Sequence, residues 1–156
     1  MTDINALILA IASNVAADAF SLPPSARQSK RLASSLVRRE LAPGELLARR
    51  GERDPHAFLV ETGRLQVFVS GGPPGSHRIV TLQAGAIVGE TALFIDAPRN
   101  ASVEALTHCV VWALATTRLE ALAQEEPQLV LALLRAAGAV LAVRMRANVE
   151  RGIPAA

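Results

Sequence analysis

Glu90 and Arg99 stand nine residues apart in one short segment, and together they could bind a polar ligand. The Glu90 carboxylate could accept a hydrogen bond from a sugar hydroxyl. Arg99 carries a permanent charge on a planar fork of N–H donors, which suits a phosphate group. Pro98 restricts the backbone just before Arg99. These residue types predict a pocket for a phosphate and a neighbouring hydroxyl, but a plain structural ion pair would explain the two charged residues equally well.

The backbone before Arg99 favours the same chemistry. Gly89 follows an apolar run, and the lack of a side chain lets the backbone approach a ligand closely. Residues 90–93 can form a single helical turn with outward-pointing N–H groups. Such groups are what a small anion site requires.

The elements that must position this segment are predicted to be β strands. The chain has 156 residues, 51% hydrophobic and 19% charged, so it can bury the core of one ordinary domain. Between residues 39 and 115, short apolar runs alternate with turn signals such as Thr62-Gly63. In residues 65–69, three aliphatic side chains (Leu65, Val67 and Val69) alternate with Gln66 and Phe68, as in a strand of a two-layered β structure. About eight such strands favour a sandwich, barrel or jelly roll, and the Gly71–Gly75 loop is predicted to be a hairpin tip.

Helices are predicted on both sides of this β unit. Apolar periodicity and capping residues indicate helices over residues 3–20, from about 26 to 37, from Thr116 or Thr117 through Leu122, and from Glu125 to about Val149. The first of these carries an apolar face broad enough to need a partner, which could be the same domain, a second copy of the chain or another protein.

The order of motifs along the chain carries a family resemblance. The segment reads Gly89-Glu90-Thr91-Ala92-Leu93, then Pro98-Arg99-Asn100-Ala101-Ser102. Before it come Pro43-Gly44-Glu45, Arg50-Gly51-Glu52 and residues 58–67, and after it comes the apolar run 109–114. This pattern resembles the phosphate-binding cassette and flanking strands of cyclic nucleotide-binding domains. That family includes regulatory subunits of cyclic-AMP-dependent kinase, cyclic-nucleotide-gated channels and the sensor halves of catabolite activator proteins. The resemblance covers about residues 32–150.

The resemblance implies a mainly β fold with flanking helices. The expected architecture is an eight-stranded β-roll, a jelly-roll-like double-stranded β-helix, with the pocket inside it. N-terminal helices precede the roll and C-terminal lid helices follow it. On this basis the chain divides into an N-terminal helical segment, 1–38, and a cyclic nucleotide-binding domain, 39–156. Within the domain, the roll covers 39–115 and the C-terminal helices cover 116–151.

The resemblance also implies which residues contact the ligand. Glu90 would accept from the ribose 2′-OH, and Arg99 would pair with the cyclic phosphate. Backbone N–H groups would complete the phosphate cradle, and Ser102 would add a hydroxyl contact. The expected ligand contacts are Gly89, Glu90, Thr91, Ala92, Arg99, Asn100, Ala101 and Ser102, with Leu141 and Arg144 on the last helix.

Two positions leave the identity and the contacts of the ligand open. Asn100 follows the arginine where the family usually has Ala, Ser or Thr, so the choice between cyclic AMP and cyclic GMP is not fixed. Cyclic AMP is preferred because it is the common bacterial messenger for this family. Arg144 lies on the lid helix where it could stack on a purine by a cation–π contact, although an exposed helix arginine would explain it equally well.

The remaining residues predict neither an enzyme nor a cofactor. Hydrolysis would need a nucleophile or a metal with a base in reach. His56, His77 and His108 fall in turns and loops without ligand spacing. Cys109, the only cysteine, excludes disulfide scaffolds and cysteine-ligated clusters within one chain, and its apolar strand predicts a buried, inert thiol. We expect no catalytic residue, no metal site and no cofactor besides the ligand.

Charge patterning gives no support for nucleic acid as a partner. The net charge is +2, and 15 of the 16 basic residues are arginine, which a GC-rich genome would also produce. Residues 27–50 hold seven basic and two acidic residues without aromatic interleaving, which favours a solvated helix face. We expect no helix-turn-helix after the last helix.

The location is expected to be cytoplasmic. Polar residues interrupt the apolar stretch 6–20, which excludes an ordinary membrane span there, and no basic region precedes it as in a signal peptide. A cytoplasmic tail tethered to a channel or an anion transporter is a second expectation.

The leading hypothesis is a non-enzymatic sensor of cyclic AMP, or of cyclic GMP, whose terminal helix changes position when the ligand binds. The receiving effector or membrane-protein domain is unknown, and a homodimer could form through the terminal helices. Two alternatives stay open. One is a protein-interaction module that keeps the roll and binds no nucleotide. The other is a sensor of a different anion, such as a cyclic dinucleotide or an organic acid.

Overall fold

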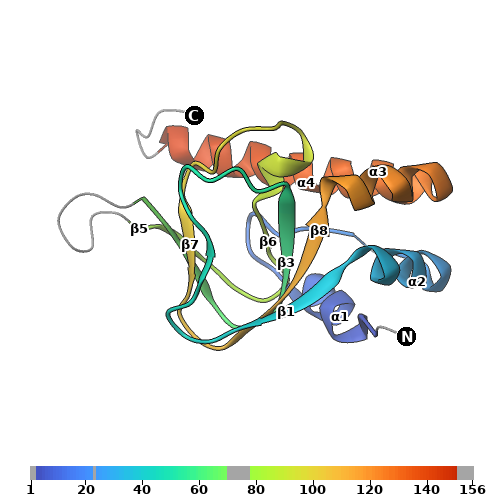
Figure 1. Ribbon diagram of the computed structural model, residues 1–156, viewed down its shortest axis with the longest axis horizontal. Coiled ribbons are helices and arrows are strands. Elements are labelled where there is room, and N and C mark those ends of the chain that lie inside the picture. Colours follow the sequence, from blue (N-terminus) through green and yellow to red (C-terminus); the bar gives the residue numbers. More distant parts are fainter. Residues whose placement is uncertain (1–2, 23, 70–77, 151–156) are drawn as a thin grey trace.

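The computed structural model describes residues 3–22, 24–69 and 78–150. Within these residues, eight strands and one short 3-10 helix lie between two N-terminal and two C-terminal helices (Figure 1). In chain order the elements are α1 (Asn5–Ser13), α2 (Ala26–Ser35), β1 (Val37–Leu41), β2 (Leu46–Ala48), β3 (His56–Thr62), β4 (Leu65–Phe68), β5 (Arg78–Leu82), β6 (Ile87–Val88), η1 (Glu90–Leu93), β7 (Ser102–Ala105), β8 (Cys109–Ala115), α3 (Thr116–Glu125) and α4 (Pro127–Glu150).

The strands form two antiparallel four-stranded sheets. One has the order β1-β8-β3-β6 and the other β2-β7-β4-β5. Neighbours in each sheet are mostly distant in sequence, as in a rolled double-stranded β-helix; β3 pairs with β8 from His56↔Ala115 to Thr62↔Val110. The predicted eight-stranded β-roll with flanking helices is therefore confirmed.

Strands β3 and β8 of the first sheet are buried along most of their length. Because successive side chains of a strand point to opposite sides, both faces of these strands are buried. On β8, Val111 and Ala113 pack between the two sheets, whereas Trp112 and Leu114 face the helices. Trp112 is 1% exposed, and its Nε1 donates to Oε1 of Glu61 at 2.9 Å. The helix-facing side of this sheet thus forms one core with the N-terminal segment and the C-terminal helices. Cys109 is buried in β8, as predicted.

The N-terminal region differs from its predicted form in two places. The first helix ends at Ser13 and does not reach residue 20, and Asn14 then accepts a hydrogen bond from the amide of Ala16. The residues beyond the helix remain anchored, since Phe20 is fully buried. The second helix ends at Ser35, and Val37 opens strand β1, so its predicted continuation to residue 37 is wrong.

A capping box explains where the second helix begins. The Ser25 hydroxyl accepts from the amide of Gln28, and the Gln28 side chain accepts from the amide of Ser25. Two of the free N–H groups at the helix start are satisfied in this way. The predicted hairpin tip at Gly71–Gly75 lies outside the described residues.

The last helix, α4, begins at Pro127, a residue suited to the first helical position. It runs beside η1 in Figure 1 and contacts it. By length and composition alone, α4 could also cross a membrane, but core helices of folded proteins meet the same criterion. Leu129, Leu133 and Val140 on α4 are buried in the helix-facing core.

Candidate functional site

The segment with the predicted chemistry lies between β6 and β7, and Gly89 is its first residue. Gly89 has a φ of +73°, a left-handed conformation that favours glycine. A Cβ at this position would collide with the guanidinium of Arg99. Gly89 is therefore needed for two reasons: the chain turns there from β6 into η1, and Arg99 packs directly against its backbone.

Arg99 is buried, with 9% of its surface exposed, and its guanidinium has several partners. It forms an ion pair with Asp54, whose Oδ2 lies 3.1 Å from Nη2. It also donates to the carbonyl of His56, and at 3.4 Å to the carbonyl of Gly89. Its charge lies 5.8 Å from the centre of the Phe58 ring. Arg99 is thus held at the base of the segment, and its Nε has no partner among the described residues.

Asp54 is the counter-ion of this buried arginine. His56 Nδ1 lies 2.6 Å from its other oxygen, Oδ1. Burial raises the pKa of Asp54, but the hydrogen bonds and charges of His56 and Arg99 outweigh burial and hold that pKa below its ordinary value of 3.8. Asp54 is therefore a carboxylate near neutral pH, and it neutralises Arg99.

Glu90 begins η1 and is also buried, at 7% exposure. One of its oxygens, Oε2, accepts from Nη1 of Arg144 at 3.0 Å. Arg144 also donates through Nε to Oδ2 of Asp18 at 2.8 Å. In this structure the guanidinium of Arg144 thus bridges two carboxylates, and its side chain is only 19% exposed.

The other predicted contacts surround these charges. Thr91 and Ala92 lie in η1, where the amide of Ala92 donates to the carbonyl of Gly89 at 3.1 Å. Ser102 is buried in β7, and its hydroxyl accepts from the amide of Arg50 at 3.0 Å. Asn100 is exposed, whereas Ala101 and Leu141 are half-buried. Their roles as ligand contacts stay predictions.

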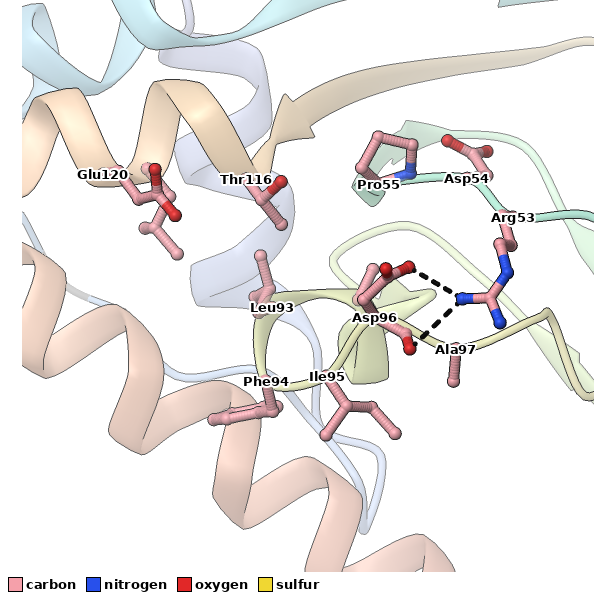
Figure 2. Close-up of a pocket in the computed structure, with 12 residues that line it drawn as sticks. Arg53, Asp54, Pro55, Leu93, Phe94, Ile95, Asp96, Ala97, Thr116 and Glu120 are labelled. Carbon is pink, nitrogen blue, oxygen red and sulfur yellow. Dashed lines mark hydrogen bonds and ion pairs between the residues drawn. The ribbon is translucent and has the colours of Figure 1, made fainter.

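A cavity of about 500 Å³ is lined by residues 92–97, by residues 53–55 and by the start of α3. Figure 2 shows Leu93, Phe94 and Ile95 on one side of it, with Thr116 and Glu120 of α3 opposite. Arg53, which also lines it, pairs with Asp96 at 3.1 Å. Ala92 is the only predicted ligand contact among its lining residues. Both arginines have a carboxylate partner, but Arg53 is exposed whereas Arg99 is buried. Water therefore screens the charge of Arg53 more strongly, and the cavity fits an anion less well than the cluster around Arg99.

Sequence reasoning missed two carboxylates of the site: Asp54, which pairs with Arg99, and Asp18, which pairs with Arg144. Asp54 precedes β3, and Asp18 lies in the irregular stretch after α1. No local pattern marks either one, because their arginine partners lie 45 and 126 residues further along the chain.

Comparison with known proteins finds similar domains. The family model described as the cyclic nucleotide-binding domain matches residues 38–126. A cAMP-dependent protein kinase regulatory subunit from Blastocladiella emersonii is 37% identical over 81 residues, which are 52% of this chain and 20% of that protein. The acetyltransferase Pat from Mycolicibacterium smegmatis is 39% identical over 83 residues, which are 52% of this chain and 24% of that protein. The matches thus span about a fifth to a quarter of these relatives.

The fold is also found in a solved structure. The crystal structure of a cyclic nucleotide-binding domain from Methylobacillus flagellatus KT aligns with a TM-score of 0.78. The alignment covers 95% of this chain and 81% of that one, at 21% identity. At this identity the likeness shows a shared fold, which extends beyond the segment matched by the family model.

Proposed function

Because the chain belongs to the cyclic nucleotide-binding domain family, we propose that it is a sensor of a 3′,5′-cyclic nucleotide, with cyclic AMP as the first candidate. The observation that carries this proposal is that Arg99 and Glu90 are both buried, and both adjoin the backbone of Gly89. Burying a charge costs several kcal/mol unless it is paired. A cationic and an anionic side chain held at one glycine are well placed to bind a phosphate and a hydroxyl.

Arg99 is the proposed phosphate ligand. Its Nε has no partner among the described residues, so this N–H can donate a hydrogen bond to an additional anion. Asp54 keeps the arginine charge neutralised until that anion arrives. The incoming phosphate would share the guanidinium with Asp54 or replace it.

Glu90 is the proposed ribose ligand. Arg144 engages its Oε2, and we assign the second oxygen, Oε1, to the ribose 2′-OH. A hydrogen bond to a charged acceptor contributes more than a neutral one. Glu90 would therefore distinguish a ribonucleotide from its 2′-deoxy analogue.

The proposed output is a shift of α4. This helix packs against η1, and its Arg144 is bonded to Glu90, so a ligand at Glu90 acts on the helix without an intermediate. A ligand changes such an equilibrium only by binding one arrangement more tightly than the other. The nucleotide would favour the arrangement in which α4 covers the base, with Leu141 beside it.

Isothermal titration calorimetry tests the proposal, using cyclic AMP first and cyclic GMP second. Wild-type protein should give a saturable one-to-one heat. Arg99→Ala should weaken binding at least about 30-fold, because a buried charge partner is lost. Arg53→Ala is the matched control: it removes the same charge from an exposed arginine paired with Asp96, and should bind like wild type.

Two other outcomes of the titration would favour a different function. No heat from either nucleotide, with protein shown to be folded and free of carried-over ligand, would overturn the proposal and favour an interaction module. Binding of another anion that needs Arg99 but not Glu90 would favour a cyclic dinucleotide or an organic acid. Glu90→Ala separates these cases, since it should weaken binding only where a ribose hydroxyl is held.

We also propose a cellular setting for the domain. The domain would be regulatory rather than catalytic, and cytoplasmic, acting either alone or attached to a channel or transporter. Cyclic AMP is placed first because a relative is described as cAMP-dependent. The exposed side chains of Leu131, Met145 and Val149 on α4 could bind a second copy of the chain. Sedimentation with and without nucleotide would test this homodimer.

A further inference from the structure

The stretch between α1 and α2 is built into the same core as the roll. Phe20 is fully buried and Leu22 is 4% exposed, and both belong to the helix-facing core. Gly85, at the turn before β6, lies so close to α1 that a Cβ there would strike the carbonyl of Ala10. The N-terminal segment is therefore fixed on the strand that leads into the ligand segment.

One side chain of this stretch reaches the site itself. Asp18 accepts from Nε of Arg144 at 2.8 Å, and Nη1 of the same guanidinium donates to Glu90 at 3.0 Å. The side chains of Asp18, Arg144 and Glu90 are 23%, 19% and 10% exposed, so water screens them only partly. The three residues come from the N-terminal segment, from α4 and from η1.

Asp18, Arg144 and Glu90 form a triad in which Asp18 orients the guanidinium of Arg144. A guanidinium is planar and rigid, so fixing Nε also fixes the direction of Nη1. Arg144 is carried on a long side chain near the end of α4, and without Asp18 its Glu90 contact would have to hold it alone. The orientation of Glu90 thus depends on a residue outside the stretch matched by the family model.

We propose that Asp18 is a positioning residue of the nucleotide site, which orients Glu90 through Arg144 and so sets the recognition of the ribose 2′-OH. This inference rests on the proposed function. It makes the N-terminal segment part of the sensor, because a ligand that contacts Glu90 also acts on Asp18.

The negative charge of Asp18 and its positioning of Glu90 have separable effects on the binding of a nucleotide. Asp18 is a negative charge near an anionic ligand, so neutralising it would by itself tighten the binding of any cyclic nucleotide. That effect is the same with or without a 2′-hydroxyl. The ratio of the Kd for 2′-deoxy-cyclic AMP to the Kd for cyclic AMP therefore cancels the charge and reports on Glu90. A general loosening of the fold would also affect both ligands alike.

The test measures this ratio for wild type, Asp18→Asn and Asp3→Asn. Asp3 lies in the same segment and is exposed, with its carboxylate accepting from the amide of Asn5, so its variant is a charge-matched control. In Asp18→Asn the ratio should fall about three- to tenfold, which is less than the full loss of a hydrogen bond to a charged group because Glu90 itself is retained. In Asp3→Asn it should equal the wild-type ratio. A ratio within twofold of wild type in Asp18→Asn would overturn the inference.

A second variant tests the triad at its centre, where Arg144 joins the two carboxylates. Arg144→Lys keeps the positive charge but lacks the fork that spans two carboxylates, so it should lower the ratio in the same way. If Asp18→Asn does not fold, an unchanged ratio in Arg144→Lys still overturns the inference, because Asp18 acts on Glu90 only through Arg144. The two proposals fail differently: wild type that binds no cyclic nucleotide refutes the function, whereas wild type that binds while either variant keeps the full ratio refutes only the role of Asp18.

Discussion

The guanidinium of Arg99 lies 3.1 Å from Oδ2 of Asp54, in a place where the arginine side chain is 7% exposed and the aspartate side chain 24% exposed. The protein thus supplies an anion of its own to the group proposed to bind phosphate. We expect this contact to stabilise the fold and to compete with the proposed phosphate, and the two effects can be measured apart.

Replacing Asp54 by asparagine should destabilise the ligand-free protein. Removing one partner of a buried pair leaves the other uncompensated, at a cost of about 3–5 kcal/mol when both are fully buried. Asp54 is partly exposed, so we expect about 2 kcal/mol. Urea unfolding measures the loss. Cyclic AMP should then stabilise this variant more than wild type, because its phosphate replaces the missing anion; equal stabilisation of both would contradict competition between Asp54 and phosphate.

The stability of wild type should fall in acid, and Asp54 should account for part of the fall. Its pKa is lower in the folded protein than its ordinary value of 3.8, so the unfolded chain takes up the proton first. The stabilisation is complete above the unfolded value and is lost as pH falls through the folded one, below about pH 4. Urea midpoints between pH 3 and 6 should fall less steeply in Asp54→Asn. Parallel curves would exclude the predicted linkage.

Gly89→Ala should impair binding beyond its effect on stability. The left-handed conformation alone should cost about 1 kcal/mol, and the new Cβ would also displace the guanidinium of Arg99. Gly44→Ala is a matched control, since Gly44 has a φ of +87° and no atom within 4 Å of the added carbon. Both variants should lose similar backbone stability, whereas calorimetry should show weakened nucleotide binding only in Gly89→Ala. Unchanged binding in both would show that the Arg99 position tolerates the shift.

Phe20→Ala should destabilise the whole domain. Phe20 is fully buried in the core shared with the first sheet, and truncating a buried phenylalanine costs about 3–5 kcal/mol. Val15→Ala in the same stretch is the control, because Val15 is 93% exposed and should cost less than about 0.5 kcal/mol. A single cooperative transition at lower denaturant would show that residues 14–22 unfold with the roll. A separate early transition would show that they do not.

The sequence predicted the roll well because its strands carry their pattern locally. Alternation along residues 65–69 and the apolar run 109–114 are properties of neighbouring residues, and turn glycines separate the strands. The helix boundaries were less predictable. An apolar face continues to Phe20, but those later side chains are buried from an irregular chain that leaves the helix at Ser13.

The charged cluster was predictable only in part, for a related reason. Glu90 and Arg99 belong to a short motif with recognisable spacing, and Gly89 precedes them with a required conformation. Their partners Asp54 and Asp18 are ordinary acidic residues until the fold brings them near. Ion pairs between distant segments leave no periodicity in a sequence. The sequence therefore suggested that Arg144 could stack on a base, but it did not indicate that Arg144 pairs with two carboxylates.

The burial of Trp112 in the helix-facing core has a practical consequence. The chain contains one tryptophan and no tyrosine, so its near-ultraviolet emission arises from this single buried side chain. The indole is shielded from solvent and bonded to Glu61. Any loosening of the helices that cover this side of the sheet should move the emission to longer wavelength and admit a collisional quencher such as acrylamide. The protein therefore carries an intrinsic optical reporter of helix docking that needs no attached dye.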